Sequence, residues 1–192
     1  MMNQLHSSVR SFWTSCAALF LLMLPMGCRS APPSADLGTY YTQCTVQLHR
    51  NLVTSTNYRS SDKAETLTIN TEVELIGIRK HRFTLRGPDG QDFRYDHIRK
   101  HSKDTPGDSF AKIFARTPVD VGAFNESEQE AISKGEAAVG MSREAVLAAI
   151  GPPPSHVTPS LESNEWKYWN TRWNSTFFVR FGDDGKVTSV GQ

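Results

Sequence analysis

The chain has 192 residues, and its 21 lysine and arginine residues nearly balance its 20 aspartate and glutamate residues, which leaves a formal net charge of +1 at pH 7. This balance argues against a protein that binds nucleic acid through a strong overall field. Hydrophobic residues make up 38% of the chain, which is ordinary for a folded protein and argues against intrinsic disorder.

The first 27 residues have the pattern of a secretory signal. Arg10 is the one charged side chain among them, and a short apolar run from Cys16 to Leu24 follows it. The run is shorter than the roughly 20 apolar residues that a transmembrane helix needs. We therefore predict a signal peptide over residues 1–27, with a short anchor that is never cleaved as the alternative.

The end of this segment, Leu24 to Cys28, resembles the lipobox of bacterial lipoproteins, in which a small residue precedes a cysteine that is acylated and becomes the new N-terminus. Gly27 and Cys28 match this pattern, whereas Pro25 stands where the family usually has leucine. The resemblance implies a lipid on Cys28 that holds the protein at a membrane. The alternative is ordinary signal cleavage nearby, which leaves Cys28 free to pair with Cys44.

Residues 28–35 are predicted to be a tether. They are rich in serine, alanine and proline, a composition that favours an extended linker over a core. Eight extended residues reach roughly 25 Å, so the folded part is expected to lie close to the bilayer. Arg29 stands where an aspartate retains enterobacterial lipoproteins in the inner membrane. The resemblance therefore implies the outer membrane, on its periplasmic side.

Residues 36–122 are predicted to form a β-rich domain. Strand-forming and polar residues alternate over residues 69–75, and again on both sides of the turn from Gly87 to Gly90, which predicts a hairpin. Several short strands at close spacing indicate a small barrel, and the segment resembles a bacterial SH3-like barrel. Cys44 lies among strand-like residues and is expected to be a small buried hydrophobe. A short helix is predicted over residues 109–116.

Residues 123–192 are predicted to contain two helices followed by three strands. Asn125 and Glu128 form a capping box for the first helix, which Gly135 ends, and Ser142 caps a second helix that ends at Gly151. Alternating strands follow, and the last two are joined by a turn at residues 183–185. The predicted fold class is therefore α+β, with a β-barrel-like domain followed by two helices packed on a three-stranded antiparallel sheet.

Residues 124–190 resemble the SmpA/OmlA (BamE-like) domain, which occurs in the small lipoprotein of the outer-membrane β-barrel assembly machine. The resemblance rests on short motifs that include Gly140-Met141-Ser142, Ile150-Gly151-Pro152 and Asp184-Gly185-Lys186-Val187. It implies the α-α-β-β-β fold and a role in protein contacts. The family's protein is a single small domain, whereas this chain has a β-rich half before it.

Three aromatic residues, Trp169, Trp173 and Phe178, are the candidate protein-binding residues. The neighbouring aromatic residues of the three strands fit the core of a small sheet, whereas these three could be exposed, and exposed aromatics are favoured anchors at interfaces. Packing within the fold is the alternative for each of them.

The sequence contains no Walker loop, dinucleotide-binding glycine motif, Cys-x-x-Cys pair or His-Glu-x-x-His zinc motif, so we predict no cofactor, no metal and no catalytic residues. His97 and His101 have helical spacing, but they lie where a strand leads into a loop and no third ligand is apparent. They belong to the one basic cluster of the chain, which is predicted to be either a solvated edge or a contact for anionic lipid headgroups. The cluster comprises Arg94, His97, Arg99, Lys100, His101 and Lys103.

These observations predict a non-catalytic envelope lipoprotein that binds an envelope protein, with a function in outer-membrane assembly or maintenance, and that has no nucleic-acid partner. One alternative is a structural lipoprotein that binds peptidoglycan through the barrel. Another is a cell-envelope thiol enzyme in which Cys44 acts with a histidine such as His49.

Overall fold

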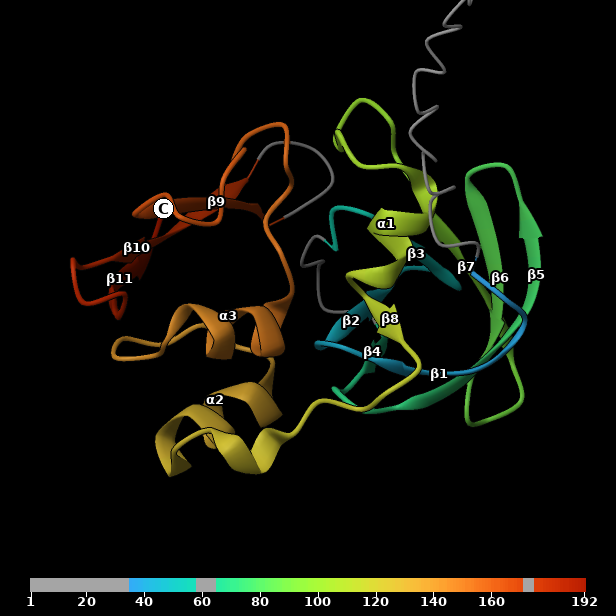
Figure 1. Cartoon of the computed structure of the whole chain (residues 1–192), viewed down its shortest axis with the longest axis horizontal. Coiled ribbons are helices and arrows are strands. Elements are labelled where there is room, and N and C mark those ends of the chain that lie inside the picture. The colour runs from blue at the N-terminus through green and yellow to red at the C-terminus, as the bar shows by residue number, and fades with distance from the viewer. Residues whose placement is uncertain (1–34, 58–64, 171–174) are drawn as a thin grey trace, which may run out of the picture. The chain divides into compact units, whose positions relative to one another are not determined.

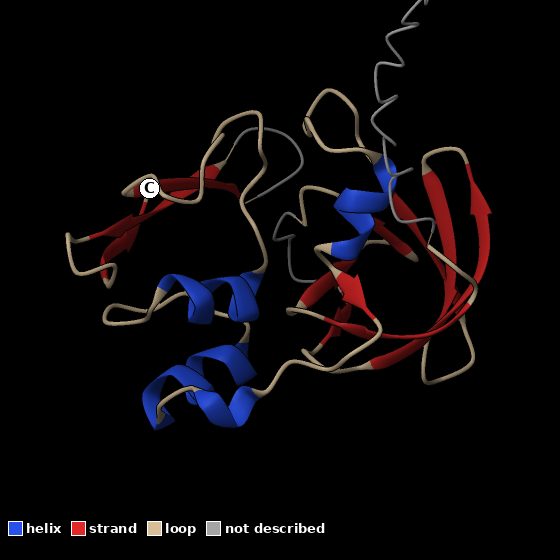
Figure 2. Ribbon diagram, in the orientation of Figure 1, coloured by secondary structure: helices blue, strands red, loops and turns tan. Residues whose placement is uncertain are grey.

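The computed structural model describes residues 35–57, 65–170 and 175–192 (Figure 1). Within these ranges the chain combines helices with two main sheets, so the predicted α+β class is confirmed (Figure 2). The predicted signal peptide, Cys28, the tether through residue 34 and Trp173 lie outside the described residues. Among the described helices, none has the length and apolar character needed to cross a membrane.

One curled sheet of six strands forms the first half, in the order β3-β7-β6-β5-β1-β8. Its strands are β1 (Gly38–Thr42), β3 (Leu52–Thr54), β5 (Glu72–Arg79), β6 (Arg82–Arg86), β7 (Asp92–Asp96) and β8 (Phe114–Ala115). Neighbouring strands are antiparallel except β3 and β7, which are parallel. The hairpin predicted around Gly87–Gly90 is confirmed, because it joins β6 to β7. A separate pair, β2 (Val46–Leu48) and β4 (Glu65–Leu67), completes this half.

Helix α1 (Pro106–Ala111) packs against the core of this sheet. Thr105 caps it by accepting a hydrogen bond from the backbone N–H of Asp108, and proline suits the first helical position. The predicted helix over residues 109–116 is wrong in its second half, because the chain leaves the helix at Lys112 and pairs β8 with β1. Phe110 explains the docking, since its ring stacks on that of Phe83 with centroids 4.4 Å apart.

The second half begins with a short 3-10 turn (Val121–Ala123) and the helices α2 (Glu126–Lys134) and α3 (Arg143–Ile150). The capping box predicted from Asn125 and Glu128 is present, as are the cap at Ser142 and the left-handed Gly135 after α2. Glu128 is buried, and its carboxylate also accepts a hydrogen bond of 2.7 Å from the backbone N–H of Ser142. One side chain thus connects the starts of both helices.

Three antiparallel strands follow in the order β11-β10-β9, namely β9 (Glu165–Trp169), β10 (Thr176–Phe181) and β11 (Val187–Gly191). Helices α2 and α3 lie on the same side of this sheet (Figure 1). The inward side chains of β9 and β10 form one buried cluster with those of the helices, with Trp166 and Val179 fully buried. The period of two along each strand explains this, because alternate residues face the helices.

The two halves have separate hydrophobic clusters, one drawn from residues 40–114 and the other from residues 131–187. Backbone hydrogen bonds nevertheless join the halves, since the N–H of Thr45 donates to the carbonyl of Ala149 over 3.2 Å. Gly151 lies against the Cys44 thiol so closely that a Cβ there would stand 2.8 Å from Sγ. Glycine at this position is therefore required by the contact as well as by its positive φ of 78°.

Candidate functional site

The side of the three-stranded sheet that faces away from α2 and α3 carries a cation–aromatic cluster, which we define as Lys167, Phe178 and Arg180. Lys167 lies directly opposite Phe178 in the strand register. The Lys167 Nζ is 5.4 Å from the Phe178 ring centroid, and the Arg180 Cζ is 5.2 Å from the same centroid. All three side chains are at least partly exposed. The cluster therefore presents an aromatic ring flanked by two positive charges.

One acidic group reduces the charge of this face. Glu165 lies opposite Arg180, and its Oε2 accepts a hydrogen bond from the Arg180 Nε at 2.8 Å. Both side chains of this pair are nearly half exposed, so the pair orients the guanidinium over the Phe178 ring more than it stabilises the fold. Phe178, one of the predicted binding residues, is thereby held on the outer face.

Trp169, a second predicted binding residue, is also on the outer face of β9 but is half-buried. Its indole stacks on the His156 ring at an interplanar angle of 13° with centroids 6.0 Å apart. The Trp169 Nε1 is buried and has no hydrogen-bond partner within the described ranges. Packing within the fold thus accounts for much of the Trp169 surface. The third predicted residue, Trp173, lies outside the described residues.

A histidine pair that the sequence did not reveal lies beside Trp169. The Nδ1 of His101 is 3.3 Å from the Nε2 of His156, and the Nδ1 of His156 is 2.9 Å from the backbone carbonyl oxygen of His101. Because a carbonyl oxygen only accepts, the Nδ1 of His156 is the donor in the second of these contacts. Burial and the nearby His156 lower the pKa of His101. The pair joins two loops that are distant in the sequence.

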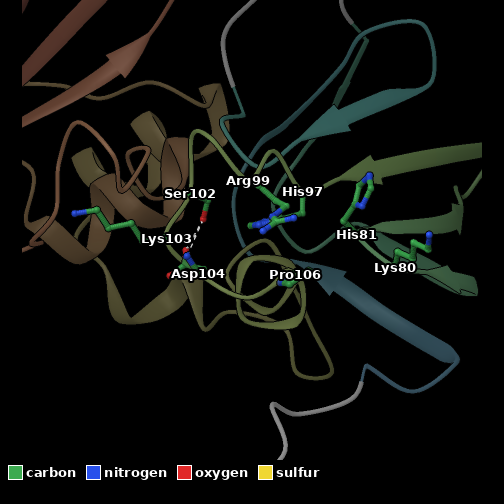
Figure 3. Close-up of a pocket in the computed structure, with 8 residues that line it drawn as sticks. All are labelled: Lys80, His81, His97, Arg99, Ser102, Lys103, Asp104 and Pro106. Carbon is green, nitrogen blue, oxygen red and sulfur yellow. Dashed lines mark hydrogen bonds between the residues drawn. The ribbon is translucent and has the colours of Figure 1, made fainter.

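A basic pocket of about 620 Å³ is lined by five basic residues (Figure 3). Three of them, His97, Arg99 and Lys103, belong to the basic cluster recognised in the sequence, and the structure adds two from the turn between β5 and β6. The basic lining residues are Lys80, His81, His97, Arg99 and Lys103. Arg94, Lys100 and His101, the rest of the predicted cluster, do not line it.

The strand pairing explains why these residues meet. The backbone N–H of His97 donates to the carbonyl of His81 over 2.8 Å, which extends the β6–β7 ladder past its last pair. Lys80 sits in the tight β5–β6 turn with a positive φ of 52°. A turn and a strand end that are far apart in sequence are thereby placed side by side. Because Lys80 and His81 lie outside the basic cluster of residues 94–103 in the sequence, the sequence alone did not identify them as lining residues of the pocket.

Asp104 is the acidic residue of the pocket lining. Its Oδ2 accepts from the Lys112 Nζ at 2.8 Å and from the Ser102 hydroxyl at 3.1 Å (Figure 3 shows the second bond). Lys112 itself is not among the lining residues. The negative charge of Asp104 is thus already paired, and the pocket remains positive.

His97 is the buried member of this lining, with 3% of its surface exposed. Its Nδ1 is buried and has no hydrogen-bond partner in the part of the chain that the structure describes. Burial lowers the pKa of His97, and the neighbouring His81 and Arg99 lower it further against the opposing effect of Asp104. The imidazole is therefore neutral at pH 7 and can donate one hydrogen bond from this nitrogen.

Cys44, the candidate nucleophile of the enzyme alternative, is a free thiol with no exposed surface. Burial raises its pKa to about 12, so the thiol stays protonated at neutral pH, whereas a nucleophilic cysteine must be a thiolate. Across residues 35–57, 65–170 and 175–192, no three histidine, cysteine or acidic side chains gather in a way that could hold a metal ion.

No family model, curated protein or solved structure matches the chain. The described residues offer three candidate features: the cation–aromatic cluster, the histidine pair and the basic pocket.

Proposed function

We propose that the chain is a non-catalytic lipoprotein of the bacterial envelope that is anchored by a lipid on Cys28 and binds another protein through the outer face of β9 and β10. The observation that carries this proposal is the cation–aromatic cluster, in which Lys167 and Arg180 both lie over the Phe178 ring. The partner is an envelope protein, and the function is in outer-membrane assembly or maintenance.

The chemistry of the face indicates what kind of surface would fit it. Lys167 and Arg180 supply two positive charges, and Glu165 offsets one of them. A complementary surface therefore carries carboxylates around an apolar or aromatic group that stacks on Phe178. Aromatic and arginine side chains dominate the binding energy of many protein interfaces, and complementary charge adds specificity and speed of association.

The anchor and the resemblance support the cellular context. The apolar run that ends in Gly27 and Cys28 fits a lipoprotein signal, and each buried methylene of an acyl chain adds about 0.8 kcal/mol of membrane affinity. The order of two helices and three antiparallel strands over residues 126–191 supports the proposed kinship with SmpA/OmlA domains, and the curled six-stranded sheet supports an SH3-like first domain. A shared fold does not imply a shared function. The partner must therefore be identified by experiments on the outer face of β9 and β10.

The buried thiol weighs against the enzyme alternative. A thiol whose pKa lies near 12 contributes almost no thiolate at neutral pH, and no part of Cys44 is exposed to a substrate. Catalysis by Cys44 would need both an exposed sulfur and a base that lowers its pKa.

Site-specific crosslinking in cells tests the proposal. A photoreactive amino acid placed at Thr176, a neighbour of Phe178 on the same face of β10, should capture one envelope protein. Phe178→Ala or Lys167→Glu should lower that capture at least about tenfold, as expected for an interface anchor worth about 2 kcal/mol. Lys100→Glu makes the same charge change on an exposed residue outside this face and should leave the capture unchanged.

Two outcomes would contradict this proposal. Capture that falls equally with Lys100→Glu would mean that overall charge, and not the cluster, attracts the protein. Retention of the chain on purified cell-wall sacculi, with no protein captured from position 176, would favour the peptidoglycan alternative. Acylation is tested separately by the intact mass of membrane-extracted protein, which should show a diacylated Cys28 as the first residue.

A further inference from the structure

We infer that the basic pocket is a binding site for a phosphate-bearing anion. This site lies in the first half of the chain, between the β5–β6 turn and the loop that precedes α1, and does not depend on the proposed protein-binding face. Three permanently charged side chains line it, those of Lys80, Arg99 and Lys103. Within the described ranges none of the three forms an ion pair.

The excess of positive charge is built into the fold. Asp104 is the acidic group that could neutralise it, but its carboxylate is engaged by Lys112 at 2.8 Å and by Ser102 at 3.1 Å. Like charges brought together without a counter-ion repel one another. A bound anion that carries more than one negative charge would relieve this repulsion, whereas a single carboxylate would balance only one of the three cations.

The lining of the pocket offers hydrogen-bond donors as well as charge. In the view of Figure 3, His97 and Arg99 lie between Lys80 on one side and Lys103 on the other. The guanidinium supplies a planar fork of donors that matches two oxygens of a phosphate. Lysine stems are flexible, so the two ammonium groups can turn toward a ligand as point charges at the rim.

The buried nitrogen of His97 is the second observation that indicates a ligand. Buried polar atoms in folded proteins almost always have a hydrogen-bond partner, and an exception calls for an explanation. The Nδ1 of His97 is such an exception among the described residues, and His97 lines this pocket. An oxygen of a bound anion that reaches this nitrogen would supply the missing acceptor, because a neutral imidazole can donate from it.

The pocket is larger than a phosphate group alone requires. Pockets that hold small organic ligands measure roughly 300–1,000 Å³, and this one measures about 620 Å³. It therefore has room for a phosphate together with an organic group such as glycerol. A soluble phosphate ester and the headgroup of an anionic phospholipid share this chemistry, and the predicted lipid anchor would keep the pocket near headgroups.

Titration calorimetry on the full chain in detergent micelles tests the site with glycerol 3-phosphate as the soluble probe. Arg99→Gln should weaken binding at least about tenfold, which corresponds to about 1.4 kcal/mol. Arg94→Gln removes the same charge from an exposed residue of β7 that does not line the pocket, and it should change the affinity less than about twofold. Lys103→Gln gives an independent second variant on the rim.

Nanodiscs distinguish the two sources of phosphate. Tighter association with phosphatidylglycerol discs than with phosphatidylcholine discs, lost in Arg99→Gln but kept in Arg94→Gln, would identify a lipid headgroup site. Binding of glycerol 3-phosphate without any lipid preference would identify a soluble ligand. The inference is overturned if neither probe binds, if succinate binds as tightly as the phosphate ester, or if both arginine variants weaken binding equally.

Discussion

Replacing Gly151 with alanine should strongly destabilise the fold, because two separate costs meet at this residue. Gly151 has φ 78° and ψ 179°, a conformation that is essentially restricted to glycine and costs other residues about 1–3 kcal/mol. An added Cβ would also stand 2.8 Å from the Cys44 Sγ, and such overpacking costs about 1–3 kcal/mol. The two costs together predict a loss of about 2–6 kcal/mol from the free energy of unfolding.

Denaturant unfolding of two further variants separates these costs. Gly90 also has a positive φ, of 80°, but an added Cβ there would meet nothing within 4 Å. Gly90→Ala should therefore show backbone strain alone and lose about 1–2 kcal/mol. Cys44→Ala removes the sulfur, so in the double variant with Gly151→Ala part of the loss should be recovered, with a coupling energy of about 1 kcal/mol or more.

Two results would contradict a steric clash at Gly151: Gly151→Ala no more destabilising than Gly90→Ala, or no recovery in the Cys44→Ala background. Either result would mean that Gly151, which follows α3, does not pack on Cys44 in the bend between β1 and β2. Because Cys44 and Gly151 belong to different halves, the same cycle measures the energy of one contact between the halves.

Two further predictions concern buried groups. Glu128→Gln should cost about 2 kcal/mol at pH 7, because charge-assisted bonds from Ser142 and Asn125 are weakened. Although burial opposes them, these bonds and Lys186 lower the Glu128 pKa below its usual 4.5, so its contribution is full above that pH and the difference in unfolding free energy should vanish in acid. Cys44 should react with a thiol reagent only at the rate of unfolding, and fast labelling of the native protein would contradict its burial.

The helix boundaries of the second half could be predicted from the sequence because local interactions set them. The Asn125 side chain accepts from the N–H of Glu128, and the Ser142 side chain accepts from that of Ala145. Caps, left-handed glycines and tight turns involve residues only three or four positions apart. The β6–β7 hairpin belongs to the same class, because a short turn brings its strands together.

The helix expected over residues 109–116 is cut short by a strand that is distant in the sequence. The apolar residues of this segment are buried as expected, since Phe110, Ile113 and Phe114 all belong to the core. The chain nevertheless leaves the helix after Ala111, because Phe114 and Ala115 complete the edge of the sheet by pairing with β1. Burial of the same side chains can be satisfied by a helix or by a strand, and a strand far away in sequence decided between them.

Membership of the candidate sites was decided by tertiary structure. The sequence pattern identified Phe178 and the basic cluster. The register of β9 and β10, in contrast, determines which cations lie beside the Phe178 ring. Lys80 and His81 join the basic pocket through strand pairing, and His101 meets His156 across 55 positions of sequence. Hydrogen bonds across a sheet depend on which strands become neighbours, and that choice is made by the burial of whole faces rather than by any local motif.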